Sequence, residues 1–229
     1  MLLKIFKDKE YTQVWRIPLP ISTVIFDVDG TLVENSRIII KLFQEIVFEF
    51  LGREMSDSEV LSLWGPPGDE IFRNLFPDSL FVKAWNKFLN NYRASSPSKG
   101  FFSYDELQRL KDNLNFLVIF TGKSRTTYEI TIEKLGFTDL FHLVMTGNDV
   151  ERSKPYPDAL FQIISILNLN KEEVIFLGDS HLDIIAGKSA GIKTAAALWG
   201  SVESEKLLNS NPDYLFSNPN DFIQFILNK

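Results

Sequence analysis

The chain contains no cysteine among its 229 residues. Disulfide bonds, thiol nucleophiles and cysteine-ligated zinc or iron-sulfur sites are therefore excluded. No apolar run approaches the length of a membrane span, and charged residues interrupt the apolar residues near the N-terminus, so no signal-peptide pattern forms. We expect a soluble, cytoplasmic protein without a membrane partner.

Positive charge is also in short supply. The chain has 24 Lys and Arg against 30 Asp and Glu, a net charge of -6, which argues against a broad surface for nucleic acid. An anionic substrate would need a local positive charge, and hard metals with oxygen ligands are compatible with the composition. The length and the hydrophobic content of 45% suffice for a full core, in one domain with an insertion or in two modest domains.

The most informative segment is Asp27-Val28-Asp29-Gly30-Thr31, which follows the apolar residues 24–26. The apolar residues favour a buried strand, and a glycine allows a sharp exit from it. Because side chains alternate along a strand, Asp27 and Asp29 are expected to point to the same side and to reach one site. The alternative is a solvated loop in which each aspartate accepts backbone hydrogen bonds.

The rest of the chain predicts an α/β fold with a doubly wound, parallel, Rossmann-like sheet. Residues 1–20 suggest a strand or hairpin extension, residues 36–92 have a helical pattern of apolar positions, and residues 94–100 have the composition of a linker. Strands and helices then alternate, as in a parallel sheet. The later strands are predicted at residues 117–121, 143–146, 174–177, 194–198 and 214–216, with the clearest later helix at 157–167.

Three further polar clusters lie at predicted strand ends or helix starts, where parallel sheets bind ligands. Thr121-Gly122 could bind a phosphate oxygen or cap the next helix, and Lys154 could bind an anion or be a solvated surface lysine. Asp179 and Asp183 follow the strand at 174–177 and could face one cavity. The alternative for this last cluster is helix capping by Asp179 or Ser180.

Taken together, these clusters resemble the motifs of the haloacid dehalogenase superfamily, from about Val24 to Leu198. The matching segments are Asp27-x-Asp29-Gly30-Thr31, Thr121-Gly122, Lys154-Pro155 and Gly178-Asp179-Ser180-x-x-Asp183, in the family's order. The helical insertion resembles the cap of the phosphoglycolate phosphatase and beta-phosphoglucomutase branch. The second acid, Asp29, argues against the dehalogenases themselves, which lack it.

The resemblance implies a core formed by residues 21–35 and 100–229, with a small all-α cap domain, residues 36–99, inserted after the first strand. It also implies a magnesium-dependent phosphatase acting on a small phosphorylated metabolite, a phosphate monoester such as a phosphoglycolate-like compound or a sugar phosphate. Asp27 would be the nucleophile that forms an aspartyl-phosphate, and Asp29 the acid and base. The alternatives are a phosphomutase of the same branch and a non-catalytic phosphate-binding or regulatory protein.

The resemblance further assigns the ligands. Mg²⁺ would be held by the carboxylates of Asp27 and Asp179 and by the backbone carbonyl of Asp29, while Asp183 would orient these ligands or contact the metal through water. The phosphoryl group would be bound by Thr121, Gly122 and Lys154.

The cap offers weaker signals. Gly65-Pro66-Pro67-Gly68 is the turn that we expect to face the cavity, with an ordinary turn between helices as the alternative. Several basic residues could meet an anionic leaving group or belong to solvated helix faces, and none is assigned: Arg53, Arg73, Lys83 and Lys87. His181 is expected to have a structural or solvent role, and His142 is expected to belong to a strand edge. The chain is expected to be a monomer or a homodimer.

Overall fold

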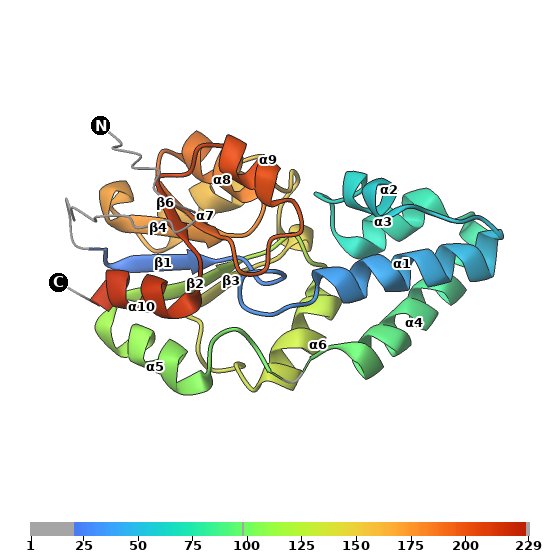
Figure 1. The fold of residues 1–229 in the computed structure, drawn as a ribbon, viewed down its shortest axis with the longest axis horizontal. Helices are drawn as coiled ribbons and strands as arrows, with labels where there is room; N and C mark the ends of the chain where they lie inside the picture. Colours follow the sequence, from blue (N-terminus) through green and yellow to red (C-terminus); the bar gives the residue numbers. More distant parts are fainter. Residues whose placement is uncertain (1–20, 98, 228–229) are drawn as a thin grey trace, which may run out of the picture.

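The computed structural model describes residues 21–97 and 99–227. Its centre is a six-stranded sheet in which every pair of neighbouring strands is parallel, in the order β3-β2-β1-β4-β5-β6 (Figure 1). This order confirms the predicted doubly wound, Rossmann-like α/β sheet. The expected strand or hairpin in residues 1–20 lies outside the described residues. The strands are β1 (Thr23–Phe26), β2 (Phe116–Phe120), β3 (Leu143–Met145), β4 (Val174–Gly178), β5 (Lys193–Ala197) and β6 (Tyr214–Phe216).

Alternate residues of the strands face two different cores. In β1, Val24 and Phe26 pack with the first layer of helices, and Ile25 packs with the second. The first layer consists of α5 (Tyr104–Asn113), α6 (Arg125–Leu135) and α10 (Pro219–Leu227). The second consists of α7 (Asp158–Ile166), α8 (His181–Ala190) and α9 (Ser204–Asn209), with short 3₁₀ turns at Gly147–Asp149 and Lys171–Glu173. Both faces of the sheet are therefore covered, as burial of apolar side chains on both sides of a parallel strand requires.

Four helices follow β1 and form a separate lobe beside the carboxyl ends of the strands (Figure 1). They are α1 (Ser36–Leu51), α2 (Asp57–Ser62), α3 (Gly68–Leu75) and α4 (Asp78–Ser95), and we refer to them as the cap. The cap has its own apolar core, in which the rings of Phe43, Phe72 and Phe88 contact one another with centroids 4.9–5.4 Å apart. The predicted all-α insertion after the first strand is thus confirmed.

The observed elements differ from the predicted ones in the bounds of several strands and in one helix. Strands β2 and β5 each start and end one residue earlier than predicted, β3 ends one residue earlier, β4 ends one residue later, and α5 was not predicted at all. The sequence of α5, YDELQRLKDN, buries only Leu107 and Leu110, so its apolar periodicity is too weak to distinguish it from a loop. Its start is instead marked by Ser103 and Glu106, which form a capping box.

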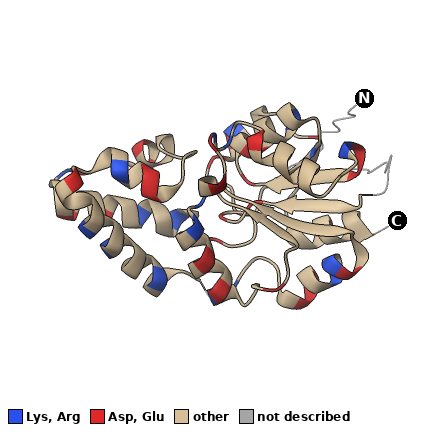
Figure 2. Cartoon of the chain, turned by 180° about the vertical axis from the view of Figure 1, so that it is seen from behind, with Lys and Arg blue, Asp and Glu red and all other residues tan. Residues whose placement is uncertain are grey.

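Charged residues lie on the helices and loops, and the strands in Figure 2 are almost free of them. Lys193 at the start of β5 is the one charged residue within the described strands. Among the described residues, no helix combines the length and the apolar character that crossing a membrane would need.

Candidate active site

The segment after β1 brings two carboxylates to one cavity. The backbone N–H of Asp27 continues the ladder with a 2.9 Å hydrogen bond to the carbonyl of Leu177, and the chain then turns so that Gly30 N–H bonds the carbonyl of Val33. Val28 is fully buried in the core below, whereas Asp27 and Asp29 both line the cavity. The alternation predicted for this pair therefore places both acids at the same site.

Gly30 allows another carboxylate to come unusually close. Its φ is +76°, in the left-handed region that favours glycine. A Cβ atom at this position would lie 2.1 Å from Oδ2 of Asp179, a distance that real Cβ contacts do not reach. Glycine is thus needed here for both the turn and the space occupied by Asp179.

Lys154 is the centre of a buried ion cluster. Its Nζ lies 2.8 Å from Asp27 Oδ1 and 2.6 Å from Asp183 Oδ1, and its side chain is 6% exposed. The other oxygen of Asp183 accepts hydrogen bonds from the backbone N–H and the hydroxyl of Ser180, at 3.0 and 2.6 Å. The solvated-lysine alternative is therefore wrong, and Asp183 is held at both of its oxygens.

Asp179 is the least satisfied carboxylate of the cluster. It is 4% exposed, and the hydrogen bond that the described residues offer it is one from the Thr31 hydroxyl at 3.5 Å. No lysine or arginine of the described part of the chain forms an ion pair with it. Burial, followed by the negative charges of Asp27 and Asp183, raises the pKa of Asp179 well above its usual value.

The same effects act on Asp27. Burial raises the pKa of Asp27 to about 6, although the nearby Lys154 opposes this rise. Oxygens of Asp27, Asp179 and Asp183 all lie within 4.8 Å of one another. A buried set of oxygen donors in which three carboxylates face one lysine fits a divalent cation such as Mg²⁺. Asp179, which has no ion-pair partner among the described residues, is the carboxylate whose charge such a cation would balance.

Thr121 and Gly122 line the cavity from the end of β2. Thr121 is 1% exposed, and its hydroxyl accepts a 3.3 Å hydrogen bond from the backbone N–H of Lys123. The helix that follows is capped by Ser124, whose hydroxyl accepts from Thr127 N–H, so the capping alternative for Thr121 is wrong. Similarly, Ser180 rather than Asp179 caps α8, which leaves the Asp179 carboxylate directed to the cluster.

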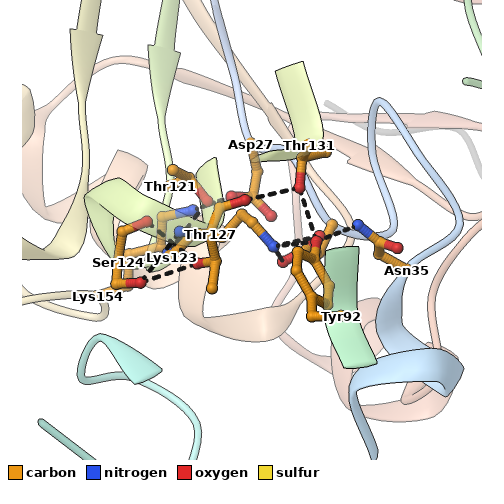
Figure 3. Close-up of polar contacts among 10 residues, drawn as sticks. Asp27, Asn35, Tyr92, Thr121, Lys123, Ser124, Thr127, Thr131 and Lys154 are labelled. Carbon is orange, nitrogen blue, oxygen red and sulfur yellow. Dashed lines mark hydrogen bonds and ion pairs between the residues drawn. The ribbon is translucent and has the colours of Figure 1, made fainter. Parts of the chain in front are cut away.

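Lys123 is a site residue that the sequence analysis missed. Its Nζ lies 2.8 and 3.0 Å from the two carboxylate oxygens of Asp29 and 2.8 Å from the hydroxyl of Tyr92 in α4 of the cap (Figure 3). Its side chain is 5% exposed. The available signal was a lysine directly after Thr121-Gly122 at a strand end, but nothing in the sequence pairs it with Tyr92.

The cap lines the cavity from the other side. Gly65 and Pro66 line it, and a Cβ atom on Gly65 would lie 3.2 Å from the backbone carbonyl of Lys154. The turn 65–68 therefore faces the core site, as expected. The cavity has a volume of about 130 Å³, and the cap covers it mainly with apolar side chains, namely Ile39, Phe43, Trp64, Ile71 and Phe88.

The basic cap residues considered from the sequence do not line this cavity. Arg53 pairs with Glu59, Lys87 pairs with Glu49, and the Arg73 guanidinium lies 4.3 Å from the ring centre of Phe81. Lys83 is exposed. These residues belong to the outer faces of the cap.

The two histidines also have contacts that fit structural roles. His142 Nδ1 accepts a 3.0 Å hydrogen bond from Leu117 N–H at the edge of β2. His181 lies at the start of α8, 4.0 Å from Glu203.

The protein-family model described as haloacid dehalogenase-like hydrolase matches residues 24–197. Among curated proteins, pyrophosphatase PpaX of Anoxybacillus flavithermus is 29% identical over 208 residues, which cover 90% of this chain and 97% of the relative. The match therefore includes both the sheet and the cap.

Solved structures show the same fold. A predicted phosphoglycolate phosphatase from Haemophilus somnus superposes with a TM-score of 0.75 at 20% identity, covering 89% of this chain and 97% of its own. A haloacid dehalogenase-like family hydrolase from Streptococcus pneumoniae has a TM-score of 0.68 at 26% identity, with 90% and 98% covered.

Proposed function

This chain belongs to the haloacid dehalogenase-like hydrolase family, and from that premise we propose that it is a magnesium-dependent phosphatase. It would hydrolyse a small phosphate ester through an aspartyl-phosphate on Asp27. The observation that carries the proposal is the buried cluster in which Lys154 lies 2.8 Å from Asp27 while Asp179, beside them, has no cationic partner among the described residues. Such a cluster is suited to a metal ion and a phosphoryl group together.

In the first step, a carboxylate oxygen of Asp27 attacks phosphorus, and the bond between phosphorus and the leaving oxygen breaks in line with it. Asp29, on the same side of the chain, donates a proton to that oxygen. In the second step, Asp29 takes a proton from a water molecule, the water oxygen bonds to phosphorus, and the bond from phosphorus to Asp27 breaks. Phosphate is released, and both aspartates return to their starting states.

Three groups would hold the metal: the carboxylates of Asp27 and Asp179 and the backbone carbonyl of Asp29. When bound, Mg²⁺ supplies positive charge that stabilises the transferring phosphoryl group. Asp183, fixed by Ser180 and Lys154, would keep the lysine in place. An ordered partner of this kind limits how far Lys154 can turn towards Asp27.

The phosphoryl oxygens would be bound by Thr121, Gly122 and Lys154. Thr121 offers its hydroxyl and Gly122 a backbone N–H at the end of β2, and Lys154 offers its ammonium. These groups belong to the core, and the cap lies over them, which would limit the access of bulk water to the reacting atoms.

The substrate would be a small phosphorylated metabolite, because the cavity between the core and the cap has a volume of only about 130 Å³. The names of the relatives supply two candidates, pyrophosphate and 2-phosphoglycolate. Sugar phosphates and nucleotides complete the panel of substrates to be measured.

The experiment is hydrolysis of p-nitrophenyl phosphate by the purified protein, with Mg²⁺ and with a chelator. We expect turnover that the chelator abolishes and that Asp27→Asn lacks. Asp112→Asn, which changes an exposed carboxylate in α5, serves as the control and should retain turnover. Activity that survives both the chelator and Asp27→Asn would contradict the mechanism, and conversion of glucose 1-phosphate to glucose 6-phosphate without phosphate release would indicate a mutase instead.

A further inference from the structure

The cavity contains a second buried cation whose position the proposed reaction does not yet use. Among the described residues, the positively charged side chains that line the cavity are Lys154 and Lys123. Lys154 contacts Asp27, the proposed nucleophile, and Lys123 contacts Asp29, the proposed proton donor. Because the leaving oxygen must receive its proton from Asp29, Lys123 lies beside the leaving group rather than beside the transferring phosphoryl group.

Lys123 is held in this position by a polar network that joins core and cap. The Tyr92 hydroxyl accepts hydrogen bonds from Lys123 Nζ at 2.8 Å and from Asn35 Nδ2 at 2.5 Å. Thr131 uses its own proton to bond the carbonyl of Thr127, so the 2.6 Å contact between Tyr92 and Thr131 has Tyr92 as the donor (Figure 3). Every position on the Tyr92 hydroxyl is therefore used, and the oxygen faces Lys123 as an acceptor.

In the part of the chain that the structure describes, the remaining wall around the leaving group offers no other positive charge. The cap side is lined by apolar residues, and the basic residues of the cap that we considered point elsewhere. A charge that a leaving group places in this space can meet one cation, Lys123, close to the scissile oxygen. Elsewhere in the space it would be buried against apolar atoms at a high cost.

We propose that Lys123 selects substrates whose leaving group carries an anionic group next to the scissile oxygen or one carbon atom away from it. A carboxylate and a phosphate satisfy this description equally, as in 2-phosphoglycolate and pyrophosphate. The inference rests on the proposed phosphatase function. It adds that the specificity for charge comes from a core residue held by Tyr92, and that the cap contributes shape and apolar contact.

The test compares kcat/KM for 2-phosphoglycolate and pyrophosphate with that for ethyl phosphate, whose leaving group is small and uncharged. A hydrogen bond to a charged group changes binding by roughly tenfold to a hundredfold. We therefore expect the wild type to prefer at least one anionic substrate by about this factor. Lys123→Met should remove most of the preference, chiefly through KM, and Lys123→Arg should restore part of it.

Two further variants serve as a control and as an independent test. Lys83→Met removes the same charge from an exposed position on α4 and should leave the ratio of kcat/KM values unchanged. Tyr92→Phe keeps the charge of Lys123 but removes the hydroxyl that orients it, so the preference for the anionic substrate should weaken. This variant tests the inference independently if Lys123→Met does not fold. Circular dichroism of each variant checks its folding.

The outcomes separate the two levels of the argument. A wild type without preference for either anionic substrate overturns the inference. A Lys123→Met variant that loses activity on all three substrates by the same factor also overturns it, because that result would mean that Lys123 only positions Asp29. A preference for one anionic substrate that Lys123→Met removes supports the inference and identifies the anion as carboxylate or phosphate. Absence of magnesium-dependent hydrolysis of p-nitrophenyl phosphate by the wild type would instead contradict the proposed function.

Discussion

Replacing the proposed nucleophile by its neutral isostere should stabilise the metal-free protein. The folded chain raises the pKa of Asp27 from 3.8 to about 6, with burial as the main cause. In the unfolded chain the carboxyl has its ordinary pKa, so between these two values the folded protein holds a proton that the unfolded protein has lost. The ionised carboxylate thus destabilises the fold by an amount that is absent below pH 3.8, grows between pH 3.8 and about 6, and is complete above that range.

The magnitude follows from the size of this pKa difference. At 1.36 kcal/mol per pH unit, the rise corresponds to about 3 kcal/mol. Asparagine is neutral and can still accept a hydrogen bond from Lys154, so Asp27→Asn should recover up to about 3 kcal/mol at pH 8, or roughly 6 to 12 °C in Tm for a chain of this size.

The assay is thermal or urea unfolding of both proteins in a chelating buffer, at pH 8 and at pH 4. The gain should be present at pH 8 and largely absent at pH 4. The exposed control Asp112→Asn should change stability by less than about 0.5 kcal/mol. An Asp27→Asn protein that is no more stable than the wild type at pH 8, or a gain of equal size at both pH values, would refute the reasoning that buried negative charges crowd this site.

Three further outcomes follow from the geometry. Gly30→Ala should weaken Mg²⁺ binding, because the added Cβ would lie 2.1 Å from Asp179 Oδ2, and the thermal shift on adding metal measures this. The control is Gly52→Ala. Gly52 has a similar positive φ of 63° but no neighbour within 4 Å, so this variant should lose stability without a change in metal affinity. The affinity for Mg²⁺, measured by calorimetry, should fall as the pH is lowered through about 6, because metal binding needs ionised Asp27 and Asp179. The fall should be up to about tenfold per pH unit for each proton displaced. An affinity that stays constant with pH would contradict this ligand set. Asp29→Asn should lower kcat/KM for ethyl phosphate by a factor of about 10² to 10⁴, and by less for p-nitrophenyl phosphate, whose leaving group needs no proton; equal losses would argue against a proton donor.

Most of the core of the site could be predicted because Asp27, Asp29, Thr121, Gly122 and Asp179 follow the end of a strand, whereas Lys154 lies in the loop before α7. The sheet brings these strand ends to one edge, and the residues assigned to the site from the sequence all line one cavity: Asp27, Asp29, Gly65, Pro66, Thr121, Gly122, Lys154, Asp179 and Asp183. The roles assigned to these residues stay predictions. The sequence could not decide whether Asp179 or Ser180 caps α8, because both side chains can accept a hydrogen bond from the first turn of a helix. In the structure Ser180 is the cap.

The contacts between cap and core could not be predicted in the same way. Lys123 and Tyr92 are 31 residues apart and belong to different lobes, so no local pattern links them. Tyr92 has the spacing of an ordinary core aromatic of α4, and it stacks on Phe88 with ring centroids 5.8 Å apart, but its hydroxyl reaches beyond the cap core. The basic residues of the cap were considered as possible contacts of the leaving group, and they do not line the cavity. A charge on a helix face does not reveal whether that face meets solvent or a cavity.

The central claim is that Asp27 forms a covalent bond to phosphorus, and it can be measured directly. The Asp29→Asn protein is mixed with p-nitrophenyl phosphate and Mg²⁺, quenched in acid within its first turnovers, and digested for mass spectrometry. We expect a phosphoryl group on the peptide that contains Asp27, and this group should be absent when a chelator is added or when Asp27 is also changed to asparagine. Turnover by the wild type together with unmodified Asp27 at every quench time, or an Asp27→Asn protein that turns over as fast as the wild type, would contradict it.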